Sequence, residues 1–268
     1  MSTYDSLRLL QLIDQMPGDF ANLPGEVFST GALAMAPGDL YVVGLNPGFG
    51  NVYPTIRDHV AEWSLESFSA FTDQCWNERC WNTDCRGLQV DARCTCQRGT
   101  HPHQIAVRRI VERARPGLDI RSVFATNAIF ARSHSADSFS TEVGLSLGKA
   151  FSVCWPIHRY FLSIVRPRVI VSLGYMDGSS AFDLFKRKAS LVSSVDAHFV
   201  PGRKFASFKW AEMTFELEAV KLSALVVGVR HPSYVPDAAD NETFAHLVAK
   251  PMTQKANPRF QPTAFGGG

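Results

Sequence analysis

Four short apolar runs, separated by stretches with helical spacing of apolar residues, are the feature that most limits how this chain can fold. They cover residues 40–44, 120–125, 169–173 and 224–229. Short continuous apolar runs are typical of strands buried on both faces, as in a parallel sheet whose connections are helices. We therefore predict an α/β domain with a central four-stranded, mainly parallel sheet and helices on both faces.

The intervening segments supply the expected helices. Apolar residues at helical spacing predict helices at about 6–16, 60–71, 105–114, 143–165, 179–189 and 241–250. Pro156 is expected at a start or kink of the fourth helix, and Asp177 is the expected cap of the fifth. Residues 192–219 are ambiguous, with two strand-like pieces near 205–208 and 213–217.

Length and composition favour one domain. The 268 residues, 46% of them hydrophobic, can bury a sizeable core. We expect the domain to span residues 1–250 with a Cys/Arg-rich insertion at about 75–103, followed by an irregular C-terminal tail at 251–268. The net charge of +2 does not by itself indicate nucleic acid.

The start of the sequence does not have the pattern expected of an export signal. The chain lacks a basic segment followed by an apolar core at its start, and no run approaches the ~18 apolar residues of a membrane span. We therefore expect a cytoplasmic monomer that does not enter a membrane.

Polar side chains follow three of the four apolar runs. Asn46 lies in an Asn-Pro-Gly turn after the first run, Asn127 follows the second, and His231 follows the fourth. In parallel sheets with helices on both faces, ligands bind beyond the carboxyl ends of the strands. The three side chains are therefore predicted to meet in one pocket.

The order of these motifs resembles the uracil-DNA glycosylase superfamily. The residues that carry the resemblance are the Gly44-Leu45-Asn46-Pro47-Gly48 turn, Asn127, the apolar third strand ending at Gly174, and His231-Pro232-Ser233, within roughly residues 38–240. The turn is most similar to the mismatch-specific and single-strand-selective branches, which carry Asn where the most active branch carries Asp. The resemblance implies a uracil-DNA glycosylase-like fold and a monofunctional DNA glycosylase, which flips a damaged or modified base, by default a uracil-type pyrimidine, and hydrolyses its N-glycosidic bond to leave an abasic site.

The residue types suit that chemistry. Breaking the bond between base and sugar passes through an oxocarbenium-like sugar and leaves an anionic base, so the site needs a placed water and a hydrogen-bond donor. Asn46 has no titratable carboxylate and can only position the water. His231 would donate to the base carbonyl as a neutral imidazole.

Other residues are assigned to binding the extruded base. Asn127 offers a donor and an acceptor for the edge of a pyrimidine. Phe49 is the first choice for stacking on the base and Tyr53 the alternative, while Gly48 leaves room for backbone amides to approach it.

DNA is the predicted partner. By resemblance, Tyr234 and Val235 stand where the family inserts a wedge into the duplex, and Ser233 would hold phosphate. Arg108 and Arg109, on the basic helix after the insertion, are expected to contact the phosphate backbone.

Five cysteines in the insertion allow several interpretations. They are Cys75, Cys80, Cys85, Cys94 and Cys96. A structural zinc or iron–sulfur cluster, free thiols and disulfides all stay open, although no tight CxxC pair of a zinc site is present. Family members that bind an iron–sulfur cluster have their first cysteines before the Asn/Asp motif, whereas this chain has none there. Catalysis itself requires no cofactor.

Rival functions follow from the same residues. The insertion leaves room for a bulkier substrate, so the enzyme could excise hypermodified bases from phage DNA in antiviral defence. An Asn at the water position also fits a non-catalytic binder of uracil-containing or abasic DNA. An unrelated nucleotide-binding α/β enzyme is disfavoured, because no glycine-rich phosphate loop opens any predicted helix.

Overall fold

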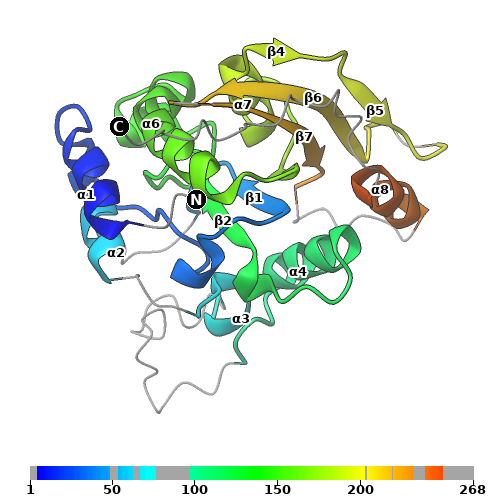
Figure 1. Cartoon of the computed structure of the whole chain (residues 1–268), viewed down its shortest axis with the longest axis horizontal. Helices are drawn as coiled ribbons and strands as arrows, with labels where there is room; N and C mark the ends of the chain where they lie inside the picture. Colours follow the sequence, from blue (N-terminus) through cyan, green and yellow to red (C-terminus); the bar gives the residue numbers. More distant parts are fainter. Residues whose placement is uncertain are drawn as a thin grey trace, which may run out of the picture.

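A mixed β-sheet with helices on both faces forms the centre of the protein (Figure 1). The computed structural model describes residues 5–48, 54–62, 67–76, 97–202, 204–218, 220–231 and 239–249. Within these residues seven strands form one sheet in the order β2-β1-β3-β7-β6-β4, with β5 paired to β6. The predicted α/β class is confirmed.

The four predicted runs form the parallel part of the sheet. They are β1 (Leu40–Gly44), β2 (Phe124–Asn127), β3 (Val169–Leu173) and β7 (Lys221–Val229). β1 lies between β2 and β3, and β3 pairs with β7, in parallel throughout. The predicted start of the second strand at Ile120 is wrong, because Ile120–Ser122 forms a 3-10 turn whose N-cap, Asp119, accepts from the backbone N–H of Arg121.

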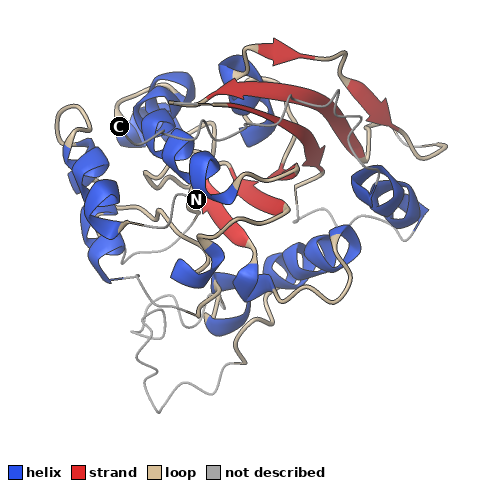
Figure 2. Cartoon of the chain, viewed as in Figure 1, coloured by secondary structure: helices blue, strands red, loops and turns tan. Residues whose placement is uncertain are grey.

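Three antiparallel strands extend this core at one end (Figure 2). They are β4 (Leu191–Val192), β5 (Asp196–His198) and β6 (Phe208–Glu216), and β6 pairs with β7 over its whole length. The prediction of four strands is therefore wrong in number. The exposed and half-buried residues of β6, among them Lys209 and Trp210, interrupt its apolar pattern, which is why the sequence indicates two short pieces there instead of one strand.

The helices are α1 (Ser6–Asp14), α2 (Ile56–Glu62), α3 (Ala70–Asp73), α4 (Pro102–Ala114), α5 (Phe139–Val143), α6 (Leu147–Val165), α7 (Ala181–Lys188) and α8 (Ala239–Ala249). Most predicted helices agree with these except at their ends, but the single helix predicted at 60–71 is wrong. α2 ends at Glu62, and Ser69 bridges to Thr30 and caps α3, with residues 63–66 outside the described ranges. The predicted helix at 143–165 is two helices, because Gly144 ends α5 in a left-handed conformation. Pro156 does not start a helix but lies inside α6. Ser180, not Asp177, caps α7 through the backbone N–H of Asp183.

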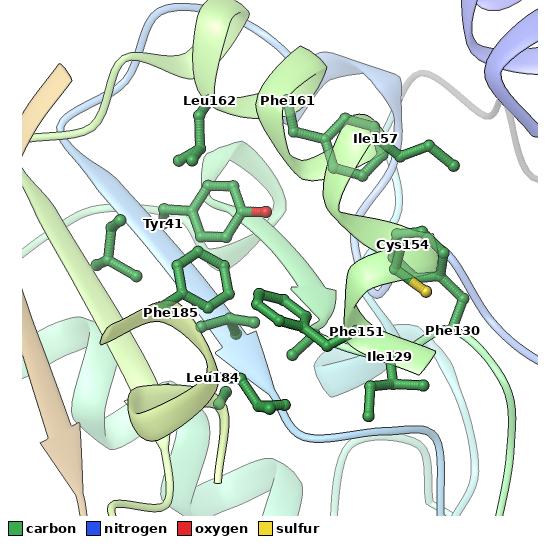
Figure 3. Packing of buried hydrophobic residues seen from close by; sticks show 14 of the residues in the cluster. Tyr41, Ile129, Phe130, Phe151, Cys154, Ile157, Phe161, Leu162, Leu184 and Phe185 are labelled. Atoms are coloured by element: carbon green, nitrogen blue, oxygen red, sulfur yellow. The ribbon is translucent and has the colours of Figure 1, made fainter. Parts of the chain in front are cut away.

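Alternate residues of β1 pack on opposite faces of the sheet. Tyr41 and Val43 join the cluster formed with α1, α6 and α7, whereas Leu40 and Val42 join the cluster formed with α4 and α8. Figure 3 shows the first cluster, with Tyr41 among the aromatic side chains of α6 and α7. Both faces of β1 are therefore apolar, as the unbroken apolar run predicts.

A buried histidine joins α6 to β1 and to the residue that follows β2. His158 lies 2.9 Å from the carbonyl of Ala128 through Nε2 and 3.0 Å from the hydroxyl of Tyr41 through Nδ1. Because a carbonyl can only accept, Nε2 carries the proton and Tyr41 donates to Nδ1. Burial lowers the pKa of His158 to about 4, so the ring is neutral and the residue after Asn127 is held against α6.

The outer edge of β2 is covered by an extended segment at residues 24–30. Phe28 bridges to Thr126 and Gly25 to Ala131, both in antiparallel orientation. A Cβ at Gly25 would lie 2.2 Å from the carbonyl oxygen of Phe130, so this close approach requires glycine. Among the described residues, no helix has the length and apolar character needed to cross a membrane.

Candidate functional site at the carboxyl ends of the parallel strands

The sheet order places the candidate site at one edge. The chain passes from β1 to β2 on one side and then returns to the other side for β3, so the carboxyl ends of β1 and β3 flank a topological switch point. Ligands of such sheets bind in the crevice at this point. Asn46 follows β1 directly at this edge, Asn127 ends the neighbouring strand β2, and His231 follows β7.

These positions bring two of the three predicted residues to adjacent strands. Gly44 and Asn127 are register partners, so the loops that carry Asn46 and Asn127 leave the sheet side by side. β7 is two strands from β1, a lateral separation of about 10 Å at the usual strand spacing. The meeting of His231 with the other two around one ligand stays a prediction.

The side-chain amide of Asn46 is held by hydrogen-bond acceptors. Its Nδ2 lies 3.0 Å from the carbonyl oxygen of Pro47, 3.0 Å from Oγ of Ser133 and 3.5 Å from the carbonyl oxygen of Ser133. The hydroxyl of Ser133 donates to the carbonyl of Ser135 at 2.8 Å, so toward Asn46 it can only accept. All three partners therefore require the nitrogen end of the amide.

This arrangement determines which atom of Asn46 is available to a ligand. Turning the amide over would bring Oδ1 against two carbonyl oxygens and would leave its N–H groups without these acceptors. No hydrogen bond joins Oδ1 to any residue in the described ranges, and Asn46 is half-buried. The residue thus presents an oriented hydrogen-bond acceptor at the carboxyl end of β1.

The Asn127 side chain packs directly over its register partner. A Cβ at Gly44 would lie 2.5 Å from Oδ1 of Asn127, so the missing side chain of Gly44 leaves the space that the amide fills. Backbone bonds of 2.8 Å from Ala128 to Gly44 and from Ile129 to Leu45 continue the pairing past the strand ends. The half-buried amide of Asn127 makes no hydrogen bond to the part of the chain that the structure describes, and its predicted contact with the edge of a base stays a prediction.

The end of the Asn-Pro-Gly turn is exposed. Nε of Arg132 donates to the carbonyl of Gly48 at 3.2 Å, and the N–H of Ser133 donates to the carbonyl of Pro47 at 3.4 Å. A Cβ at Gly48 would meet no atom within 4 Å, so the packing of the protein does not require glycine there. The predicted role of Gly48, close approach to a ligand, stays a prediction.

His231 lies in a group of aromatic and imidazole rings. Its ring is 5.3 Å from that of His103 in an edge-on arrangement, and the ring of His103 is 5.5 Å from that of Trp76. Burial, reinforced by the neighbouring His231 and His101, lowers the pKa of His103 to about 3. Although His231 is exposed as a whole, desolvation of its ring also lowers its pKa. Near neutral pH both rings are neutral, the state that the predicted role of His231 requires.

The two predicted phosphate-binding arginines differ in their surroundings. Nη1 of Arg108 donates to the carbonyl of Phe71 in α3 and, at 2.7 Å, to that of Gly99, so it joins α3 to the C-terminal part of the cysteine-rich insertion. Gly99 has φ +67°, and a Cβ there would lie 2.8 Å from the same nitrogen. Arg109 is exposed and forms no ion pair with the described residues. Arg108 therefore has a structural role that the sequence does not reveal, whereas the predicted phosphate contact of Arg109 stays a prediction.

Several predicted site residues lie outside the described ranges. They are Phe49, Tyr53, Cys80, Cys85, Cys94, Cys96, Ser233, Tyr234 and Val235. Of the cysteines in the insertion, Cys75 is described, and it is buried with a free thiol. No group of three or more potential metal ligands occurs among the described residues. The predicted roles of the residues outside these ranges stay predictions.

Two residues of the site were not singled out for their roles from the sequence. Gly44 could have been found, because parallel pairing of the first two runs places it beside Asn127. Ser133 carries no such signal, since it is one of several serines in the loop after β2.

Comparison with known proteins identifies no relative. The chain matches no protein-family model, no curated protein and no solved structure. A function for this protein is therefore inferred from the site residues and from the order of their motifs.

Proposed function

We propose that the protein is a monofunctional DNA glycosylase with a uracil-DNA glycosylase-like fold. The observation that carries the proposal is the fixed amide of Asn46, which presents Oδ1 as an acceptor beside Asn127 at the carboxyl ends of two neighbouring parallel strands. An acceptor held in this way can orient one water molecule, which is what hydrolysis of a glycosidic bond requires of it.

In the proposed reaction, Oδ1 of Asn46 accepts a hydrogen bond from the attacking water. The bond between the base nitrogen and C1′ of the deoxyribose breaks, and its electron pair leaves with the base. The water oxygen then bonds to C1′ and releases a proton to solvent, which leaves an abasic site. Because Asn46 cannot take that proton, the reaction needs a base that departs readily.

His231 and Asn127 supply what the leaving base needs. The neutral imidazole of His231 donates a hydrogen bond to the base carbonyl, where negative charge develops. The amide of Asn127, which makes no hydrogen bond to the described residues, pairs its donor and acceptor with the edge of the flipped pyrimidine. Uracil is the simplest base with this edge and a leaving group of suitable acidity, so it is the proposed default substrate.

The proposal is tested on labelled oligonucleotides. Single-stranded and duplex DNA carrying uracil or a modified pyrimidine is incubated with the protein and then treated with alkali, which breaks the strand at abasic sites. The proposal predicts strand breaks at the modified position with the parent protein. With Asn46→Ala, the rate of strand breakage should be at least about 100-fold lower. Intact strands with every substrate would reject it, and equal rates for the parent and the variant would reject the role of Asn46.

A further inference from the structure

The hairpin between β5 and β6 projects from the same edge of the sheet as the candidate site. β6 is antiparallel to β7, and its first residue, Phe208, pairs with Val229 at the carboxyl end of β7. The N–H of Arg230, next to His231, donates to the carbonyl of Ser207 at 3.1 Å. The last residue of the hairpin loop at 199–207 therefore lies beside the residue that precedes His231.

The base of this hairpin is firmly held. The N–H of Ser207 donates to the carbonyl of His198 at 2.8 Å, and the buried hydroxyl of Tyr175, beyond the end of β3, donates to the carbonyl of Ala206. His198 pairs with Phe208, and their rings are stacked at 5.0 Å. The hairpin turns at Pro201 and Gly202, where the φ of +80° favours glycine.

The arms of the hairpin expose aromatic side chains that the fold leaves uncovered. Phe199 is 55% exposed and Phe205 is 50% exposed, one on each arm. Nζ of Lys204 lies 5.6 Å from the ring centre of Phe205. The sequence from Phe199 to Ala211 contains three lysine or arginine residues and no acidic one, although Lys209 lies 4.0 Å from the carboxylate of Asp177.

We propose that this hairpin binds single-stranded DNA, with Phe199 and Phe205 stacking on unpaired bases and Lys204 contacting phosphate. Exposed aromatic rings among basic residues are the combination by which proteins bind single strands without reading their sequence. The position beside His231 places the hairpin next to the strand whose base would enter the candidate site. This inference rests on the proposed function, because it takes DNA as the substrate, and it assigns the hairpin to the nucleotides that flank the extruded base.

The test is the affinity of the full chain for a fluorescein-labelled single-stranded oligonucleotide, measured by anisotropy. Loss of one stacked base weakens binding by roughly 5- to 150-fold, so the double variant Phe199→Ala/Phe205→Ala should bind at least about fivefold more weakly than the parent. Lys204→Ala should reduce the slope of log affinity against log salt by about 0.7, the value for one phosphate contact on a single strand.

Leu191→Ala is the matched control. Leu191 is 68% exposed, but it lies on β4 opposite Thr214, away from the carboxyl end of β7. Equal weakening by this variant, unchanged binding by the double phenylalanine variant, or no binding by the parent would each overturn the inference. Weaker binding without any base release by the parent would support the hairpin role while rejecting the glycosylase, so the two proposals fail separately.

Discussion

Replacing Ser133 with alanine should slow base release without unfolding the protein. Nδ2 of Asn46 has two protons, and its two short acceptors are Oγ of Ser133 and the carbonyl of Pro47, each at 3.0 Å. The variant removes the first acceptor and keeps the second. The amide then loses part of its preference for the orientation that presents Oδ1 to the water.

The structure sets the size of this effect. One hydrogen bond between uncharged groups contributes about 0.5–1.5 kcal/mol, which corresponds to a rate lower by roughly 2- to 13-fold. Complete removal of the amide in Asn46→Ala should cost about 100-fold or more, because the variant lacks the acceptor that is proposed to orient the water. The effect of Ser133→Ala should appear in kcat and leave KM unchanged, since Ser133 acts through Asn46.

Single-turnover and steady-state assays on a uracil-containing oligonucleotide measure both constants. Ser135→Ala is the control, because Ser135 accepts from Ser133 through its backbone carbonyl, which the variant keeps. In an Asn46→Ala background, Ser133→Ala should have no further effect, a coupling that a general loss of folding would not produce. A parental kcat for Ser133→Ala, or full additivity of the two variants, would refute the positioning role.

Three further predictions follow from neighbouring contacts. Gly44→Ala should lower activity while leaving the melting temperature nearly unchanged, because the new Cβ would lie 2.5 Å from Oδ1 of Asn127 and only a side chain must move; a parental rate would contradict this. Asn46→Asp should make the rate rise with pH through the neutral range, because the introduced carboxylate faces carbonyl oxygens that disfavour its charge; a pH-independent rate between pH 5 and 9 would count against the geometry. The free energy of unfolding should fall as pH drops from 6.5 toward 4, because His158, with its pKa lowered to about 4, stays neutral in the fold while the unfolded chain binds a proton. The slope from this one group is at most about 1.4 kcal/mol per pH unit. Thermal melts should show a shallower decline for His158→Gln, and an unchanged decline would refute this assignment.

The parallel core could be predicted because its strands are apolar on both faces. β1 places Tyr41 and Val43 on one side and Leu40 and Val42 on the other, so the apolar run alone indicates that both faces of the strand are buried. β6 could not be recognised in the same way. Buried and more exposed residues alternate from Ala211 to Glu216, but the adjacent half-buried Lys209 and Trp210 break the pattern, and the pairing of β6 with β7 is a long-range property that local periodicity does not encode.

The candidate site was predictable only where strand ends determine it. Asn46 and Asn127 follow neighbouring parallel strands, so their proximity follows from the fold class. The loop after β2 brings Ser133 back to Asn46 through contacts that no spacing rule specifies. Likewise, the two carbonyls that accept hydrogen bonds from Arg108 belong to Phe71 and Gly99, which tertiary packing brings together.

The central claim is that Asn46 orients a water that hydrolyses the bond between a base and its deoxyribose. Its most direct test is chromatographic detection of the free base after single-turnover incubation of uracil-containing single-stranded and duplex oligonucleotides, with the parent protein and Asn46→Ala side by side. The account predicts stoichiometric release of the base by the parent and a rate at least about 100-fold lower for the variant. No free base from any substrate, or release at the same rate by both proteins, would contradict it.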